Sequence, residues 1–248
     1  MDALIPDHAG TFYQTTLASL HQVLAPRTYF EVGTLNGDTL ALARCPSIAV
    51  DPQFMFNKPE LIERIVAKPR LMLFQMGSDA FFAAHDPERL LGAKLDFAFL
   101  DGMHRCEFLL RDFANTERYC KPNSIVALHD CLPVEPFMAE RTPSAREAAS
   151  PHRQGWWTGD VWRFALLLKR VRRDLVITAL NAPPTGLVLV TNLDPQSRLL
   201  TRDYADHVRT MLSWDLEALG IETLFAELEV ESTSALQSEE QITARFWL

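Results

Sequence analysis

Short apolar runs alternate with segments of helical character over most of this chain, and this alternation constrains the fold more than any other feature. The segment over residues 106–113 is the clearest helix, since Cys106, Leu109, Leu110 and Phe113 recur at the spacing of one helix face. Near-continuous apolar strands separated by helices are typical of a mostly parallel sheet covered on both faces. The predicted strands are 28–32, 47–50, 71–75, 95–100 and 124–128, and the other predicted helices are 11–24, 37–44, 58–67, 79–85 and 160–173.

Two further strand-like runs, 174–180 and 187–191, are joined by the short connection 181–186. A connection of this length predicts an antiparallel pair at one edge of the sheet. We therefore expect an α/β fold with a seven-stranded, mostly parallel sheet and an antiparallel edge hairpin. Residues 1–194 are expected to form the main domain with its N-terminal helix, and 195–248 a helical C-terminal extension.

Composition and charge indicate a globular protein that does not bind duplex nucleic acid. The 248 residues are 48% hydrophobic and 23% charged, which is ordinary for a globular domain. The formal net charge of -8 disfavours a duplex nucleic-acid binder, because such proteins need a basic surface over phosphates. The one basic cluster, 169–173, is interpreted as the last turn of a helix, where cations complement the helix dipole.

The chain shows no feature of an exported or membrane protein. Residues 1–10 contain no basic region followed by an apolar run, and no apolar stretch is long enough to span a bilayer. The four cysteines have no CxxC spacing, so we interpret them as reduced thiols. A cytoplasmic protein without membrane contact is expected.

Polar residues follow each of the five predicted parallel strands. In an open parallel sheet, ligands bind beyond the carboxyl ends of the strands, where the strand order reverses. The residues predicted to lie there are Glu31, Gly33, Asp51, Ser78, Asp101, His104, His129 and Asp130.

The turn after the first strand has the form Glu31-x-Gly33-x-x-x-Gly37. Glycines let a backbone approach a ligand closely, and the N-terminus of the helix predicted over 37–44 adds partial positive charge. Together with the acid Glu31, this turn predicts a small molecule with both a cationic and an anionic end.

Asp51 ends the next strand, roughly twenty residues after the turn, where an acid can accept both hydroxyls of a ribose. The alternative is a solvated strand-end aspartate or a helix N-cap. The turn lacks the denser glycine arrangement that a dinucleotide pyrophosphate needs, so a nucleoside carrying an amino acid is favoured over NAD.

At these positions the chain resembles the class I S-adenosylmethionine-dependent methyltransferases. The matching segments are 30–37, 50–52, 99–104 and 126–130, and the last two resemble a subgroup of small-molecule O-methyltransferases with Asp-Gly-x-His and His-Asp at successive strand ends. The resemblance covers about residues 10–192, and Pro122-Asn123-Ser124 departs from the family's usual Pro-Gly-Gly.

The resemblance implies a Rossmann-like fold and methyl transfer from S-adenosylmethionine to a hydroxyl oxygen of a small molecule, such as a sugar or secondary metabolite. The residues it assigns to the cofactor are Glu31, Gly33 and Gly37 at the methionine end, Asp51 at the ribose, Ser78 and Asp79 near the adenine, and Asp101.

Some relatives bind a divalent metal through carboxylates at the ends of the fourth and fifth strands, positions held here by Asp101 and Asp130. Oxygen ligands suit Mg²⁺, whereas the neighbouring His129 favours a transition metal. Such an ion lowers the pKa of a bound oxygen and makes it nucleophilic. The alternative is that Asp130 and His129 only orient the following loop.

Removal of the acceptor proton is the other chemical requirement. His104 and His129 are the candidate bases, because an unperturbed histidine titrates near neutral pH, and Asp130 completes the predicted catalytic set. A structural role is the alternative for each histidine. His152 is a weaker candidate.

The segment 131–155 lacks periodicity and is rich in proline, so it is expected to be either a substrate lid or a disordered loop. Trp156 and Trp157 behind it are predicted to wall an acceptor pocket, while Trp162 is better explained by core packing.

Two other functions stay open. One is a nucleoside-binding protein that has lost catalysis. The other is a metal-dependent hydrolase that uses Asp101, His104, His129 and Asp130. The acceptor and the formation of a homo-oligomer are not determined by these residues.

Overall fold

A seven-stranded sheet organises the computed structural model, which describes residues 7–143 and 151–248. The strand order is β3-β2-β1-β4-β5-β7-β6, with β1 to β5 parallel and β7 antiparallel to both β5 and β6. The predicted fold, including the antiparallel edge hairpin, is confirmed. The strands are β1 (Tyr29–Val32), β2 (Ser47–Val50), β3 (Leu71–Phe74), β4 (Leu95–Leu100), β5 (Cys120–His129), β6 (Val176–Leu180) and β7 (Leu187–Thr191).

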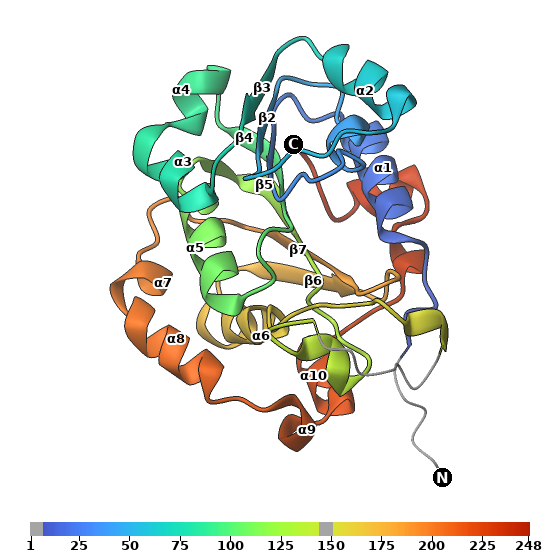
Figure 1. Ribbon diagram of the computed structural model, residues 1–248, viewed down its shortest axis with the longest axis vertical. Coiled ribbons are helices and arrows are strands. Elements are labelled where there is room, and N and C mark those ends of the chain that lie inside the picture. The colour runs from blue at the N-terminus through green and yellow to red at the C-terminus, as the bar shows by residue number, and fades with distance from the viewer. Residues whose placement is uncertain (1–6, 144–150) are drawn as a thin grey trace.

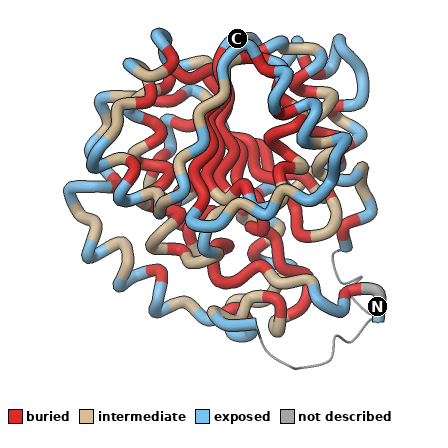
Figure 2. The backbone as a smooth tube through the Cα atoms, turned by 45° about the horizontal axis from the view of Figure 1, so that its top comes forward, coloured by how far each residue is buried: buried red, intermediate tan, exposed pale blue. Residues whose placement is uncertain are grey.

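Helices cover both faces of this sheet, and the buried strands run through the middle of the molecule (Figures 1 and 2). Side chains alternate along each strand, so Phe30 and Val32 enter one apolar layer while Tyr29 enters the other. The first layer contains residues of α3 (Ser78–Ala84), α4 (Pro87–Leu91), α5 (Cys106–Glu117) and α6 (Trp162–Val171), and the second contains residues of α1 (Tyr13–Leu24) and α2 (Pro59–Val66).

The C-terminal residues pack on both layers. Met211 and Leu224 belong to the first layer, and Leu236 and Ile242 to the second. The polar segment 231–240 contains the turn η4 (Thr233–Leu236), with Leu236 buried in the second layer. The division at residue 194 remains a prediction. The C-terminal helices are α7 (Leu199–Arg202), α8 (Tyr204–Leu212), α9 (Leu216–Leu219), α10 (Ile221–Glu227) and α11 (Glu239–Thr243).

The prediction of a helix over residues 37–44 is wrong. Only the short 3₁₀ turn η1 (Leu40–Leu42) forms there, and Ala43 is already extended. Pro46 disfavours helical backbone in the residue before it, which limits any helix after Gly37 to about two turns. The turn after β1 therefore does not lead into the N-terminus of an α-helix, and the positive helix end expected there is absent.

Strand β5 begins earlier than predicted. Leu95 pairs with Cys120 and Phe97 with Ile125, so β5 contains a bulge. Pro122 lies in this bulge, where the missing N–H does not interrupt a regular ladder. Within the described ranges, no helix combines the length and apolar character that crossing a membrane requires.

Candidate active site

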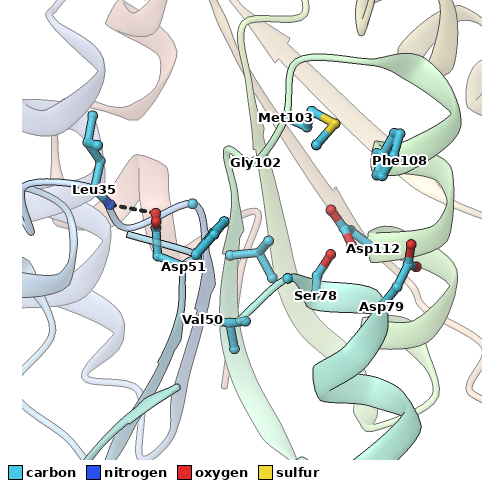
Figure 3. Close-up of a pocket in the computed structure, with 13 residues that line it drawn as sticks. Leu35, Val50, Asp51, Ser78, Asp79, Gly102, Met103, Phe108 and Asp112 are labelled. Atoms are coloured by element: carbon cyan, nitrogen blue, oxygen red, sulfur yellow. Dashed lines mark hydrogen bonds between the residues drawn. The ribbon is translucent and has the colours of Figure 1, made fainter. Parts of the chain in front are cut away.

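A cavity of about 320 Å³ opens at the carboxyl ends of β1 to β4 (Figure 3). β1 lies between β2 and β4, so the strand order reverses at this point, which is the usual ligand position in an open parallel sheet. The residues that line the cavity are Val32, Gly33, Leu35, Val50, Asp51, Pro52, Gly77, Ser78, Asp79, Gly102, Met103, Phe108 and Asp112.

Asp51 lies on one side of this cavity and is tied to the turn after β1 (Figure 3). Its Oδ2 accepts a hydrogen bond from the backbone N–H of Leu35 at 2.8 Å, and its Oδ1 accepts one from Gln53 N at 2.7 Å. Each carboxylate oxygen can accept a further hydrogen bond. The side chain is therefore held by the backbone and retains the capacity to bind two hydroxyls.

Gly33 is the glycine that the turn requires. Its φ is +84°, and a Cβ atom built on it would stand 2.0 Å from the carbonyl oxygen of Asp101. Its backbone N–H donates to Val50 O at 3.0 Å. Any side chain here would separate β1 from β4 at the edge of the cavity.

Asp112 lies on the opposite side of the cavity, next to Ser78, and is not among the site residues predicted from the sequence (Figure 3). Burial raises the pKa of Asp112 to about 7, although a hydrogen bond with Ser78 opposes the rise. The Oδ1 atom of Asp112 has no hydrogen-bond partner within the described ranges. One signal was available in the sequence: Asp112 follows Leu109 by three residues and so places an acid on the apolar stripe of α5.

Asp79 also lines the cavity, but its carboxylate is paired. Arg111 Nη2 lies 2.8 Å from Asp79 Oδ2, and Arg111 Nε donates to Asp79 Oδ1 at 2.9 Å. Arg111 also donates to the hydroxyl of Tyr204 on α8. Asp79 thus connects the cavity rim to the C-terminal helices.

Glu31, Gly37 and Asp101 are not among the lining residues, and their assignment to the cofactor remains a prediction. Glu31 is completely buried on the opposite face of β1 and accepts a hydrogen bond from the hydroxyl of Tyr29. Burial raises the pKa of Glu31 to about 7, against hydrogen bonds that lower it. Gly37 has a φ of +84° and packs against Phe56 and Ile65.

Four of the predicted residues converge next to the cavity, after β4 and β5. His104 Nε2 lies 3.0 Å from Asp130 Oδ2 and 3.4 Å from Asp101 Oδ1. His129 Nδ1 lies 3.3 Å from the same two carboxylate oxygens. We call Asp101, His104, His129 and Asp130 the His–Asp cluster. Because Gly102 and Met103 line the cavity, the cluster and the cavity share one loop.

The charges in the His–Asp cluster stabilise one another. Burial alone lowers the pKa of each histidine, but the neighbouring carboxylates outweigh it and raise that of His104 to about 9 and that of His129 to about 10. Burial raises the pKa of Asp101, while the charge of His129 and hydrogen bonds from both histidines bring it well below its usual range. The prediction that these histidines titrate near neutral pH is therefore wrong for this arrangement of charges.

The backbone of the cluster is unusual. His104 and Asp130 have φ values of +54° and +58°, a region that residues other than glycine rarely adopt. The surroundings hold both side chains in place: Thr185 donates to Asp130 Oδ1, and Tyr13 stacks on His129 with ring centroids 4.0 Å apart. Strain of this kind is concentrated at functional sites.

Three residues of the cluster have the donor atoms of a metal site. One ligand atom each from Asp101, His104 and Asp130 lies within 4.8 Å of the others. A mixed oxygen and nitrogen set of this kind suits a divalent transition metal, and the two carboxylates also suit Mg²⁺. The predicted ligands Asp101 and Asp130 are therefore brought together, and His104 joins them.

The segment after β5 closes over the cluster. Trp157 stacks on His104 with ring centroids 4.7 Å apart, and its Nε1 donates to Glu140 O. Trp162 is buried in the first apolar layer, as its position in a helix indicated. The predicted lid overlaps residues 144–150, and both these residues and the side chain of His152 lie outside the described residues.

Asp160 caps the start of α5. It is fully buried, and its Oδ1 accepts a hydrogen bond from Cys106 N at the start of α5, at 2.8 Å. Arg141 bridges Asp160 and Glu107, so the loop after β5 is fixed to α5. Asp160, Cys106 and Glu107 form a second group of potential metal donors, but Arg141 already supplies its counter-charge.

Comparison with known proteins agrees with this architecture. No protein-family model and no curated protein matches the sequence. Among solved structures, the cofactor-bound protein Rv0187 from MTB is 13% identical, with a TM-score of 0.51 over 74% of this chain and 81% of that one. A candidate O-methyltransferase from Klebsiella pneumoniae is 14% identical, with a TM-score of 0.50 over 75% and 83%.

The chain has the class I methyltransferase fold. The predicted resemblance to class I methyltransferases is thereby confirmed for the architecture of the sheet and its helices. In this fold the cavity beside Asp51 and the His–Asp cluster occupy the sheet edge that binds ligands.

Proposed function

We propose that this protein transfers the methyl group of S-adenosylmethionine to a hydroxyl oxygen of a small molecule. A divalent cation held by the His–Asp cluster would assist the transfer. The observation that carries the proposal is the shared Gly102–Met103 loop, which joins the cavity beside Asp51 to the paired histidines and carboxylates. A donor and an acceptor bound on the two sides of this loop would be neighbours.

The residues of the cavity fit a nucleoside that carries an amino acid. Asp51 would accept hydrogen bonds from the ribose hydroxyls through oxygens that Leu35 and Gln53 already hold in place. At the other end, the unpartnered Oδ1 of Asp112 fits the exocyclic amine of an adenine, between Ser78 and Phe108. The absence of a Cβ on Gly33 leaves the backbone of the turn free to approach the ligand.

The cofactor supplies an electrophilic methyl group on a sulfonium, and displacement from sulfur to oxygen requires the acceptor hydroxyl to lose its proton. Positioning supplies most of the acceleration of such an in-line reaction. Asp101, His104 and Asp130 would hold the divalent cation, whose chemical contribution is to lower the pKa of the acceptor hydroxyl. The proton would then pass to solvent, the oxygen–methyl bond would form as the sulfur–methyl bond breaks, and S-adenosylhomocysteine would leave. Trp157 stacks on His104 and limits the access of water from that side.

The proposal is tested by turnover. Purified protein is incubated with S-adenosylmethionine, Mg²⁺ or Mn²⁺ and a panel of hydroxylated sugars and phenolic metabolites, and release of S-adenosylhomocysteine is measured. We expect acceptor-dependent release that a chelator suppresses. Tight cofactor binding without release for any acceptor would support a silent nucleoside-binding protein. Chelator-sensitive hydrolysis without the cofactor would support the metal-dependent hydrolase.

A further inference from the structure

A basic groove lies at the amino ends of β1 and β2, on the opposite edge of the sheet from the cavity beside Asp51. It consists of two adjoining cavities of about 360 and 340 Å³. Pro26, which lies before β1, and Cys45, which lies before β2, line the first cavity. Arg44 and Arg64 line both cavities and so form the boundary between them.

The groove exists because the helix expected after β1 does not form. The single turn η1 covers only part of the space between α1 and α2, which lie on the same side of the sheet (Figure 1). Residues 41–45 therefore form the floor between the two helices. In a chain with a longer helix here, that helix would fill part of this volume.

The two arginines of the groove have no acidic partner among the described residues. Over the ranges 7–143 and 151–248, the side chains of Arg44 and Arg64 make no hydrogen bond and no ion pair. Lys68 lines the second cavity and is almost completely buried, and its Nζ donates a hydrogen bond to Ala43 O. Burial, together with the charge of Arg64, lowers the pKa of Lys68 to about 8, although Cys45 and Glu31 oppose the change.

A buried histidine in the first cavity also lacks a partner. His21 is 8% exposed, lines the cavity, and packs edge-on against Tyr29. Its Nδ1 atom has no hydrogen-bond partner among the described residues. A buried polar atom without a partner is costly unless a ligand or water satisfies it. The unpartnered Nδ1 atom therefore supports a ligand site independently of the two arginines.

The opposing charges near the groove are weaker than the cations. The carboxyl end of α2 carries roughly half a negative charge, and Glu31 behind Lys68 has its pKa raised to about 7 by burial. Arg44, Arg64 and Lys68 together provide up to three positive charges. The three cations of the groove therefore exceed these two opposing charges.

We propose that the basic groove is a second ligand site, which binds the phosphate group of a small organic molecule between Arg44 and Arg64. Each guanidinium donates two parallel hydrogen bonds to an oxyanion. A phosphate has enough oxygens to accept from both arginines and from Lys68, whereas one carboxylate has only two. The apolar wall of Ala18, Leu42 and Pro26 receives the organic part, within reach of His21.

Calorimetry with phenyl phosphate, benzoate and inorganic phosphate tests this assignment. We expect phenyl phosphate to bind the wild-type protein at least about tenfold more tightly than benzoate, because the carboxylate satisfies fewer of the cations. Inorganic phosphate is expected to bind more weakly than phenyl phosphate, since it lacks contacts with the apolar wall. Benzoate or inorganic phosphate binding as tightly as phenyl phosphate would overturn the assignment to an organic phosphate.

Two paired variants locate the site. Arg44→Ala with Arg64→Ala is expected to weaken phenyl phosphate binding at least about tenfold, since it removes both guanidinium groups. Arg89→Ala with Arg202→Ala removes the same charge from two exposed arginines that line neither cavity of the groove, each beside an acid, and should change binding less than about twofold. Equal affinity of both paired variants would overturn the proposal.

Amide signals in heteronuclear NMR provide the second measurement. Phenyl phosphate is expected to shift signals of residues 41–45 and 64–68 and to leave that of Ser78 unchanged. Shifts confined to the cavity beside Asp51, or to the basic cluster 169–173, would overturn the proposal. Both arginines are exposed, so the paired variant is expected to unfold at the wild-type denaturant midpoint.

Discussion

Gly33 lies so close to Asp101 that a Cβ atom added to it would stand 2.0 Å from the Asp101 carbonyl oxygen. These two residues end adjacent parallel strands at the point where the strand order reverses. The glycine is therefore required by the neighbouring strand as well as by its φ of +84°. Through this contact, the turn beside the cavity and the first carboxylate of the His–Asp cluster are held in fixed relation.

Gly33→Ala is expected to destabilise the protein by several kcal/mol, because the methyl group forces β1 and β4 apart. The control is Gly92→Ala, at a glycine with a similar φ of +78° and nothing within 4 Å of the added Cβ. The free energy of unfolding of this control variant is expected to fall by about 1 kcal/mol, from backbone strain alone. Urea unfolding compares the two variants. Equal losses would show that the contact with Asp101 is unimportant.

Asp112→Ala is expected to weaken binding of S-adenosylhomocysteine about tenfold, because it removes the buried acceptor beside Ser78. Asp112→Asn keeps a hydrogen-bond acceptor and adds a donor at this position, so its affinity for S-adenosylhomocysteine is expected to fall less. Calorimetry at one pH measures both affinities. Wild-type affinity in the alanine variant would remove Asp112 from the cofactor site.

Glu31 is expected to make stability depend on pH. Its pKa is about 7 in the folded protein and about 4.5 when unfolded, so its contribution to stability is fully present below about pH 4.5 and is lost as the pH rises through 7. At about 1.4 kcal/mol per pKa unit, the loss is roughly 3 kcal/mol. The difference in unfolding free energy between wild type and Glu31→Gln should fall by this amount from about pH 4.5 to about pH 9. A constant difference would contradict the buried, protonated state of Glu31.

Asp130→Asn is expected to weaken Mn²⁺ binding at least about tenfold, since it replaces a charged ligand of the His–Asp cluster. Glu107→Gln is the matched control in the second group of donors, where Arg141 already neutralises the acids. Calorimetry is expected to show unchanged affinity for this variant. Loss of binding in Glu107→Gln instead would assign the metal to the second group.

The sequence was sufficient to predict the strands and the polar residues at their ends, because both follow from local pattern. All five parallel strands and the edge hairpin form where they were expected, within a few residues. The convergence of Asp101, His104, His129 and Asp130 followed from one rule, that the carboxyl ends of parallel strands meet at one edge.

The remaining features depend on contacts that no local pattern records. The helix expected over 37–44 is reduced to η1, with Leu40 and Ala41 buried in a single turn and Ala43 already extended. Asp112 was missed because its role arises from the packing of α5 against the cavity. The pKa values of His104 and His129 rise because two carboxylates are brought within 3.4 Å of them, which a sequence does not reveal.

The most direct test of the proposed cofactor is calorimetric binding of S-adenosylhomocysteine to wild type, Asp51→Ala and Asp215→Ala. Asp215 caps α9 by accepting a hydrogen bond from Ala218 N at 2.8 Å, so its loss removes the same kind of backbone contact far from the cavity. We predict binding to wild type and Asp215→Ala, and an affinity at least about tenfold lower for Asp51→Ala. Absence of binding to wild type at millimolar ligand, or equal affinity of all three proteins, would contradict the proposed cofactor site.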